Sequence, residues 1–443
     1  MVSRKDGEAA LVAFMEKLVL EEKILPQLCV AVERLDGSVV FSHSVGSARS
    51  GGEPFTRSTI HRVYSMSKML TSASIMRLVE QGMLKLDTKL SSLLQEWDDC
   101  LDCADGSVPK RPIKVLDLLT HTAGLTYGFW ELEPPAEEAA VAKGYRRMAL
   151  DLPHPITPQF GKLDAEYPKN YREFTKRLAQ FPLLYSPGER FRYSTATDLL
   201  SYIIQVVTLE KSLEIQFRKD FYEPLKLEDT SFFLEASKLH RLSSINIVNL
   251  KKFPVTSPEH DIEIIDARNS DIQNRSGVGG LEDNESCFWR RTSASKLPNP
   301  ENLQSGGGGL LSTVDDMMKF GKAILTDGAV VSAETRQQMF ADYLGKNNIA
   351  KTGLVSKLPG YGLGMWTTER LDTDENREIL PAFQKMGKQA GGWSGAAGTA
   401  LTVDPQHQVV IVIATQLLNY AILKPTLHAD LFNLIYDIIN ADH

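Results

Sequence analysis

The sequence predicts a mixed α/β fold of the α+β kind: an antiparallel sheet flanked by N- and C-terminal helices, with a mainly helical lobe inserted. Two observations predict it. Both ends of the chain have the patterns of strands and hairpins, whereas helical periodicity dominates the middle. The 443 residues are also enough for a large core and two lobes. We expect residues 1–64 and 305–443 to form a discontinuous sheet domain and residues 65–304 a mainly helical domain.

The N-terminal region predicts a helix followed by a hairpin. Apolar residues between positions 11 and 19 share one helical face in GEAALVAFMEKLVLEEK, and Pro26 ends that helix. The next segment, LCVAVERLDGSVVFSHSVG, alternates apolar and polar residues around Asp36-Gly37, a strong hairpin turn. The chain therefore opens with a helix and two paired strands.

The middle of the chain predicts helices and one irregular stretch. SKMLTSASIMRLVEQGML has the pattern of a strong helix, and IKVLDLLTHTAGL that of a short helix entering a glycine turn. YREFTKRLAQF and the segment from ATDLLSYIIQVV to FYEPL add further helical periodicity. From about residue 256 to 304 the sequence becomes polar and irregular, which is typical of a long loop such as a lid or wall.

The C-terminal region returns to strands. SGGGGLLSTVDDMMKFGKAIL predicts a turn and a helix with Ser312 or Thr313 as its N-cap. GYGLGMWTTE, KQAGGWSGAAGTALTVDP and QVVIVIATQ predict a β-meander, and LHADLFNLIYDIINA a closing helix.

Composition excludes several classes of function. The net charge of -7 gives no reason to expect nucleic acid or an anionic membrane surface as a partner. The N-terminus lacks the features of a secretory signal, and VVIVIATQLL is too short to span a bilayer, so we expect a cytoplasmic protein. Cys100 and Cys103 form a C-x-x-C, but no second pair and no histidine pair accompany it. We interpret them as reduced surface cysteines, and we expect neither a metal nor a cofactor.

The most informative motif is Ser65-Met66-Ser67-Lys68. The chain contains Ser-x-x-Lys three times, but only this copy opens a long helix; the others are Ser107–Lys110 and Ser293–Lys296. Residues three apart share a helix face, so the Lys68 ammonium can reach the Ser65 hydroxyl. The positive end of the helix also favours a developing oxyanion. The alternative is an ordinary N-cap serine followed by a solvated lysine, which the motif alone favours.

Other segments add polar and small residues that can accompany this serine. LLTHTAGLTYGF places His121 in a turn after a helix, and YSPGERFRYSTATDLL places Tyr193 before another helix. GGWSGAAGT is a small-residue strand that a ligand can approach closely. Taken by itself, Tyr193 is more typical of a packed tyrosine than of a catalytic one. We assign His121 to fastening its turn and Asp198 to a structural role.

Together these segments resemble one family. The Ser65–Lys68 motif, LLTHTAGL, SPGERFRYS, GGGGLLSTVDDMMKF and GGWSGAAGTALTVDP occur in the order found in serine β-lactamase-like proteins. The resemblance runs from about residue 10 to the C-terminus, weakest over about 240–300. It is closer to family VIII carboxylesterases and acyltransferases of the lovastatin type than to class C β-lactamases. It implies the β-lactamase/transpeptidase-like fold.

The resemblance also implies roles for individual residues. Ser65 corresponds to the acylated nucleophile, and Lys68 to the group that activates it and shuttles its proton. Tyr193 corresponds to the tyrosine that serves as general base and then as acid to the leaving group. The oxyanion hole would consist of the backbone N–H of Ser65 and that of Ala396. Tyr127 lines the expected pocket.

Two motifs depart from the β-lactamase pattern. Tyr193-Ser194-Thr195 has threonine where β-lactamases usually have asparagine, and Trp393-Ser394-Gly395 stands where they have Lys-Thr-Gly. The esterase subgroup typically has Trp-Gly-Gly there, so Ser394 is a further departure. An indole cannot supply the positive charge that binds a substrate carboxylate, but it offers apolar contact area. We therefore expect Trp393, Ser394 and Gly395 to bind a neutral, partly apolar acyl group.

The function expected from these residues is that of a serine carboxylesterase acting on a small-molecule ester or acyl-thioester. No G-x-S-x-G and no H-E-x-x-H occurs in the chain, so neither an α/β-hydrolase elbow nor that zinc site is supported. The alternatives are an acyltransferase using the same acyl-enzyme, a β-lactamase or D-Ala-peptidase, and a non-catalytic scaffold protein.

Overall fold

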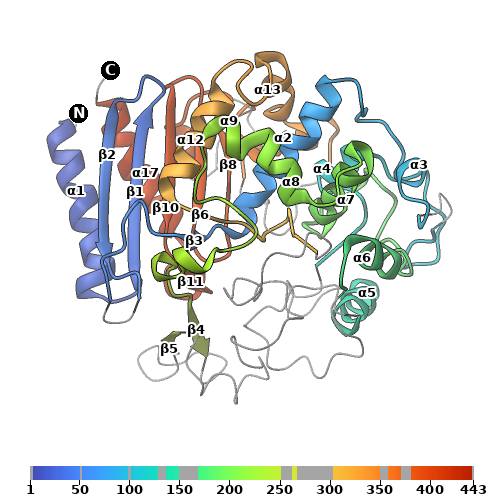
Figure 1. Cartoon of the computed structure of the whole chain (residues 1–443), viewed down its shortest axis with the longest axis horizontal. Coiled ribbons are helices and arrows are strands. Elements are labelled where there is room, and N and C mark those ends of the chain that lie inside the picture. Colours follow the sequence, from blue (N-terminus) through green and yellow to red (C-terminus); the bar gives the residue numbers. More distant parts are fainter. Residues whose placement is uncertain are drawn as a thin grey trace.

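A six-stranded antiparallel sheet forms the left half of the computed structural model in the view of Figure 1. The structure describes residues 3–49, 52–97, 101–127, 136–148, 168–250, 262–266, 303–349, 358–370 and 381–441. The strand order is β2-β1-β10-β9-β8-β7. The strands are β1 (Gln27–Arg34), β2 (Val39–Gly46), β7 (Trp366–Thr367), β8 (Gly391–Ser394), β9 (Ala400–Asp404) and β10 (Val409–Ala414).

The sheet joins the two ends of the chain. β1 pairs with β10, so that Val30 lies opposite Ile413, and β1 pairs with β2 through the predicted hairpin at Asp36-Gly37. β7, β8, β9 and β10 follow one another as the predicted meander. The predicted fold class is thus confirmed.

Helices cover both faces of this sheet. Successive side chains of a strand point to opposite faces, so Leu401 of β9 faces one layer and Asp404 the other. Leu401 packs against α12 (Val314–Leu325), where Gly321 allows the close approach. Asp404 accepts a hydrogen bond from Tyr436 of α17 (Leu427–Asn440), which packs against α1 (Arg4–Glu16). The α1 helix ends in a π-helical turn, Lys17–Glu21, and Thr313 is the N-cap of α12, as predicted.

The helical part of the chain is organised around α2 (Ser67–Glu80), which is buried along most of its length between α7 and β8. Its other helices are α3 (Leu90–Leu93), α4 (Val115–Leu119), α5 (Ala136–Arg147), α6 (Tyr171–Leu178), α7 (Ala196–Thr208), α8 (Leu213–Phe217) and α9 (Glu223–Leu225). A π-helical turn, Arg218–Tyr222, joins the last two, and a 3₁₀ turn, Ala236–Arg241, follows. The helices expected from the sequence are present, although the split into two domains stays a prediction.

Short elements complete the described chain. On the C-terminal side these are α13 (Ala333–Met339), α14 (Tyr343–Lys346), α15 (Pro381–Gln384) and α16 (Tyr420–Leu423). β3 (His61–Arg62) pairs with β6 (Leu311–Ser312) just before α2. This pairing fixes the chain that enters the site described below.

A second small sheet corrects the prediction for the middle of the chain. β4 (Asn246–Leu250) and β5 (Ile262–Asp266) form an antiparallel pair, and β11 (Leu417–Leu418) joins β4 in parallel. The prediction of an irregular segment over 256–304 is wrong at β5, where IEIID alternates as a strand does. The rest of that segment, apart from Leu303 and Gln304, lies outside the described residues.

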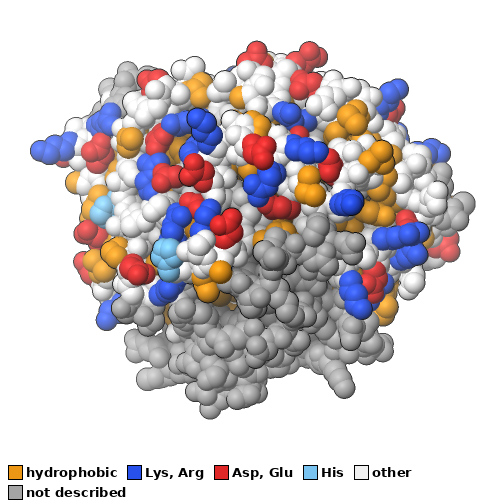
Figure 2. Space-filling view, viewed as in Figure 1, with side chains coloured by type: hydrophobic (Ala, Val, Ile, Leu, Met, Phe, Trp, Pro, Cys, Tyr) orange, Lys and Arg blue, Asp and Glu red, His pale blue; other side chains and the backbone are white. Residues whose placement is uncertain are grey.

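Two further predictions concern the surface. Cys103 is only 3% exposed, so its interpretation as a surface cysteine is wrong; Cys100 lies outside the described residues. On the face shown in Figure 2, acidic and basic side chains alternate over the described part without a large patch of one sign. Among the described helices, none is long and apolar enough to cross a membrane.

Candidate active site

Ser65 lies on a tight turn rather than in the helix that follows. The 3₁₀ turn Tyr64–Met66 precedes α2, and Ser65 forms no N-cap hydrogen bond, so the interpretation as an N-cap is wrong. Tyr64 has a φ of 48°, in the left-handed region that costs a non-glycine residue about 1 kcal/mol. Its side chain is buried, which raises the pKa of its phenol to about 12. Ser65 itself stays partly exposed.

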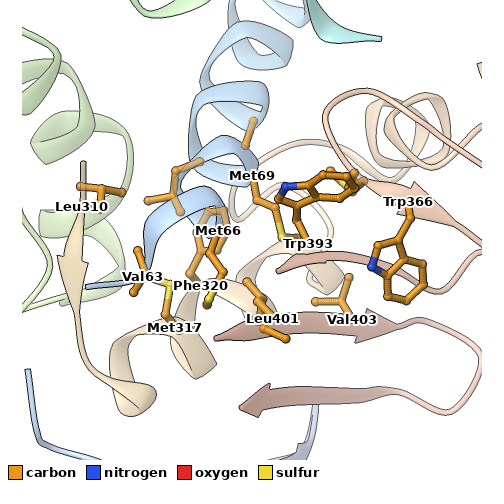
Figure 3. Close-up of a cluster of buried hydrophobic side chains, with 14 of the residues drawn as sticks. Val63, Met66, Met69, Leu310, Met317, Phe320, Trp366, Trp393, Leu401 and Val403 are labelled. Carbon is orange, nitrogen blue, oxygen red and sulfur yellow. The ribbon is translucent and has the colours of Figure 1, made fainter. Parts of the chain in front are cut away.

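A layer of buried apolar side chains packs against the core-facing side of this turn. Met66 is fully buried with Met317 and Phe320 of α12 and Leu401 of β9, as Figure 3 shows. Burying a side chain of this size contributes about 1.5–3 kcal/mol. Because Met66 is anchored in this way, the neighbouring Ser65 is held toward the opposite, solvent-facing side.

Lys68 is completely buried beside Ser65, one turn along the chain. Its Nζ donates hydrogen bonds to Ser65 Oγ at 3.3 Å, to the Tyr127 hydroxyl at 3.3 Å and to the carbonyl oxygen of Gly307 at 2.5 Å. An ammonium group has three protons, so each finds one oxygen acceptor. The interpretation of Lys68 as a solvated helix lysine is therefore wrong.

The carbonyl that holds Lys68 belongs to the glycine run, whose contribution the sequence did not predict. A Cβ on Gly306 would collide with Ser201 and Thr71, and one on Gly307 would lie 2.7 Å from Asp198 Oδ2. The signal was present as four consecutive glycines, but a backbone carbonyl leaves no side-chain signature.

Asp198, on α7, holds this glycine loop in place. It accepts hydrogen bonds from Ser305 Oγ at 2.6 Å and from the backbone N–H of Gly307 at 3.2 Å. Burial raises the pKa of the Asp198 carboxyl, against the opposing effects of Ser305, the Lys68 charge and the Gly307 N–H. Asp198 thus lies behind Lys68 and contacts it through Gly307, in keeping with the structural role expected for it.

Two tyrosines lie beside the Lys68 ammonium, and a tryptophan packs on one of them. Its Nζ lies 4.8 Å from the centre of the Tyr193 ring and 5.6 Å from that of Tyr127. Trp393 Nε1 donates a hydrogen bond to the Tyr193 hydroxyl at 3.1 Å, and the two rings lie 5.5 Å apart. The structure thus brings together Ser65, Lys68, Tyr193, Tyr127 and Trp393, which come from four separate segments of the chain.

His121 fastens the turn that carries Tyr127. Its Nδ1 lies 3.1 Å from Ser194 Oγ, and its ring centre lies 4.8 Å from that of Tyr193. The backbone carbonyl of His121 also accepts a hydrogen bond from the N–H of Arg192 at 2.8 Å. Burial, and then the charge of Lys68, lower the pKa of His121 well below its usual value, so the ring is neutral at pH 7.

The end of β8 lies directly beside the Ser65 turn. A Cβ on Gly395 would collide with the Val63 carbonyl and Thr399, so this backbone approaches closely only because the residue is glycine. Ser394, the last residue of β8, is partly buried, and Ala396 is exposed. Among the described residues, neither the Ser65 nor the Ala396 backbone N–H has a hydrogen-bond acceptor. Two such donors beside a serine hydroxyl suit an incoming anionic oxygen.

This combination of fold and site is matched by one family model. The model described as Beta-lactamase matches residues 26–429. The chain belongs to the Beta-lactamase family. The match includes the segments that carry Ser65, Lys68, Tyr193 and Trp393, so the resemblance stated from the motifs is confirmed at the level of the family. Within the described residues, no group of three or more His, Cys, Asp or Glu side chains is arranged to hold a metal ion.

Individual relatives are similar at low identity across most of their length. The chain is 26% identical to Protein Rv1367c of Mycobacterium tuberculosis, covering 82% of this chain and 79% of that protein. It is 25% identical to esterase EstB of Burkholderia gladioli, covering 92% and 90%. Among solved structures, EstCE1, a hydrolase with promiscuous acyltransferase activity, superimposes with a TM-score of 0.68 at 23% identity, covering 97% and 98%. This last likeness supports the fold.

Proposed function

We propose that this protein is a serine hydrolase that cleaves carboxylic esters through a covalent acyl-enzyme on Ser65. The observation that carries the proposal is the fully buried Lys68, whose Nζ lies 3.3 Å from the Ser65 hydroxyl. A buried lysine one helical turn after a partly exposed serine is arranged to activate it rather than to interact with solvent. The esterase activity of the relative EstB supports the same reading.

The reaction follows from these positions. The reaction begins once the Lys68 ammonium has lost one proton to solvent. Ser65 Oγ then attacks the ester carbonyl carbon, and its proton passes to the Lys68 amine and from there toward Tyr193. The backbone N–H groups of Ser65 and Ala396 hold the resulting oxyanion. Collapse breaks the bond to the alcohol oxygen, which leaves with a proton delivered through Tyr193. Water then attacks the acyl carbonyl, the acid leaves, and the Ser65 hydroxyl is restored.

The motif Trp393-Ser394-Gly395 favours a neutral, partly apolar substrate. Trp393 donates its indole N–H to Tyr193, so this position supplies an uncharged aromatic side chain and no positive charge. A β-lactam or a D-Ala peptide brings a carboxylate that this position leaves without a counter-ion. Tyr127, Ser394 and Gly395 complete the proposed pocket, which suits an ester or an acyl-thioester better than a β-lactam.

An acyltransferase is the second candidate, because the same acyl-enzyme can pass its acyl group to an alcohol. EstCE1 combines hydrolase and acyltransferase activity on this fold. Whether the acyl group passes to an alcohol or to water depends on how well the pocket binds an alcohol relative to water.

The test is turnover of a p-nitrophenyl ester series and of nitrocefin by the wild type and by Ser65→Ala. We expect ester turnover in the wild type and its loss in the variant. Ser107→Ala is the matched control, since Ser107 begins another Ser-x-x-Lys and is exposed, and it should retain full activity. Turnover that survives Ser65→Ala excludes Ser65 as the nucleophile, and nitrocefin hydrolysis faster than ester cleavage favours a β-lactamase.

A second readout distinguishes hydrolysis from transfer and from a scaffold function. Ester cleavage is followed with and without a primary alcohol, and the new ester is measured by mass spectrometry. Formation of the new ester at the expense of free acid supports the acyltransferase. A protein that neither turns over esters nor reacts with a fluorophosphonate at Ser65 is a non-catalytic member.

A further inference from the structure

The turn that carries Ala396 is held by backbone hydrogen bonds. The N–H of Gly398 donates to the carbonyl of Gly395 at 3.0 Å, which closes a tight turn with Ala396 and Ala397 at its centre. The Ala397 carbonyl accepts from the N–H of Leu417 at 3.1 Å. Neither bond uses the N–H of Ala396, and this residue is exposed.

A third carbonyl of this turn, that of Gly398, is held by a histidine from another layer of the molecule. His428, on α17, places its Nε2 3.0 Å from the carbonyl oxygen of Gly398. A carbonyl only accepts, so Nε2 carries the hydrogen, and Nδ1 of the neutral ring can accept from the Tyr420 hydroxyl at 3.4 Å. The ring centre lies 5.5 Å from that of Tyr420 and 6.3 Å from that of Phe432. Burial lowers the pKa of His428, which keeps the ring neutral at pH 7.

The surrounding packing leaves this turn little freedom. Gly398 has a φ of 84°, which favours glycine, and a Cβ there would lie 2.6 Å from Thr415 and 3.4 Å from Tyr420. On the Ser65 side, Thr399 Oγ1 donates to the Val63 carbonyl at 3.1 Å. The turn thus contacts the Ser65 segment on one side and α16 and α17 on the other.

We infer that His428 is a positioning residue for the oxyanion-binding turn: its bond to the Gly398 carbonyl fixes the direction of the Ala396 N–H. The inference rests on the proposed acyl-enzyme function and deepens it. Oxyanion donors stabilise the transition state only when they are oriented before the charge develops. A helix on the far face of the sheet therefore contributes to the orientation of the site without contacting the substrate.

The test compares three variants with p-nitrophenyl butyrate. His428→Phe keeps an aromatic ring but removes the donor, and we expect kcat to fall by about tenfold while KM changes by less than about twofold. His428→Gln retains an N–H near the same position and should restore kcat to within about threefold of the wild type. His407→Phe is the matched control: its histidine binds Asp404 at the opposite end of β9, and we expect a lower Tm with unchanged kcat.

Two further measurements keep the inference testable if His428→Phe folds poorly. Tyr420→Phe removes only the hydroxyl that orients His428, and we expect a smaller fall in kcat, of about twofold to threefold. Hydrogen–deuterium exchange over residues 395–399 should increase in His428→Phe and recover in His428→Gln, a readout that requires no substrate.

Specific results would overturn the inference. They are an unchanged kcat in His428→Phe, a fall in kcat that His428→Gln does not reverse, or an equal fall in His407→Phe. Failure of the proposed function is distinguished by the wild type: if a fluorophosphonate does not label its Ser65, both the acyl-enzyme and the positioning role are excluded. If labelling occurs but does not slow in His428→Phe, only the positioning role is excluded.

Discussion

Two buried polar clusters lie at opposite ends of β9, and they treat buried charge differently. At one end, Asp404 accepts hydrogen bonds from His407, Tyr436 and the N–H of Gly387. We call these four residues the aspartate anchor. Burial alone would raise the pKa of Asp404, but the hydrogen bonds from His407 and the backbone outweigh it and hold the pKa below its usual value. The anchor is stabilised as a charged group.

At the other end is the lysine cluster of Ser65, Lys68, Tyr127, Tyr193 and Gly307. Its ammonium is bonded to three uncharged oxygens, and the pKa of the carboxyl behind it, Asp198, is raised by burial. A lysine bonded only to uncharged oxygens can lose and regain a proton without breaking an ion pair, whereas a carboxylate bonded to a protonated histidine cannot. We therefore expect the anchor to serve stability and the lysine cluster to serve catalysis.

The largest expected effect tests the lysine cluster. Lys68→Met should lower kcat for ester cleavage by about 10³-fold, because the serine loses the group that accepts its proton. Its Tm should stay equal or rise, since a methionine of similar volume replaces a buried charge. Lys322→Met is the control. Lys322 lies on α12 and binds Glu33 of β1, so its loss should lower Tm slightly and leave kcat unchanged. A large fall in Tm for Lys68→Met would assign Lys68 to stability.

The next effect tests the anchor. Asp404→Asn should lower the free energy of unfolding by about 3 kcal/mol. The amide replaces a buried carboxylate oxygen by an N–H donor, so donors that bind Asp404 lose their acceptor. Activity per folded molecule should not change. The measurement is urea denaturation with kcat determined on the same samples, and a loss of kcat without a loss of stability would contradict the comparison.

The two buried aspartates should also respond to pH with opposite signs. The pKa of Asp404 is lowered from 3.8, so its stabilisation is present above about pH 4 and is lost as pH falls through the lowered value. The pKa of Asp198 is raised from 3.8, so its contribution is present below that value and is lost as pH rises through the raised one. The free energy of unfolding of Asp404→Asn should therefore approach that of the wild type in acid. For Asp198→Asn, the difference from the wild type should instead be smallest at neutral pH.

Much of the fold was predictable because it depends on local patterns. The hairpin at Asp36-Gly37, the meander from β7 to β10 and the closing helix α17 follow from period-two and period-3.6 spacing. The β4–β5 pair was missed because it interrupts a polar region with only five residues on each side. Short strands of that kind depend on their partner, here β11, for stability.

The site was predictable where it depends on side chains in motifs. Ser65, Lys68, Tyr193 and Trp393 came from spacing and family resemblance, and the structure brings them together. The Gly307 carbonyl could not be predicted, because a backbone acceptor has no side-chain signature in the sequence. The contribution of α17 to the oxyanion turn depends on a tertiary contact between residues 30 apart, which no local pattern records.

A fourth prediction separates the roles of the two tyrosines within the lysine cluster. Lys68 Nζ donates to the Tyr127 hydroxyl but lies over the ring of Tyr193, whose hydroxyl accepts from Trp393. We expect Tyr193→Phe to lower kcat by about 10²-fold, as loss of an acid–base group does, and Tyr127→Phe by about tenfold through poorer orientation of Lys68. Single-turnover acylation measures both. The reverse order would assign proton transfer to Tyr127.

The smallest effect concerns Trp393, which belongs both to the site and to the core. Its indole donates to Tyr193 and its ring packs at 5.4 Å, edge to face, on Tyr361. Trp393→Phe keeps much of the packing and removes one neutral hydrogen bond, worth about 1 kcal/mol. We therefore expect kcat to fall by about fivefold and the unfolding free energy by about 1 kcal/mol, both measured on the same preparation. A change in stability alone would place Trp393 with the anchor, whereas a change in kcat alone would place it wholly within the lysine cluster.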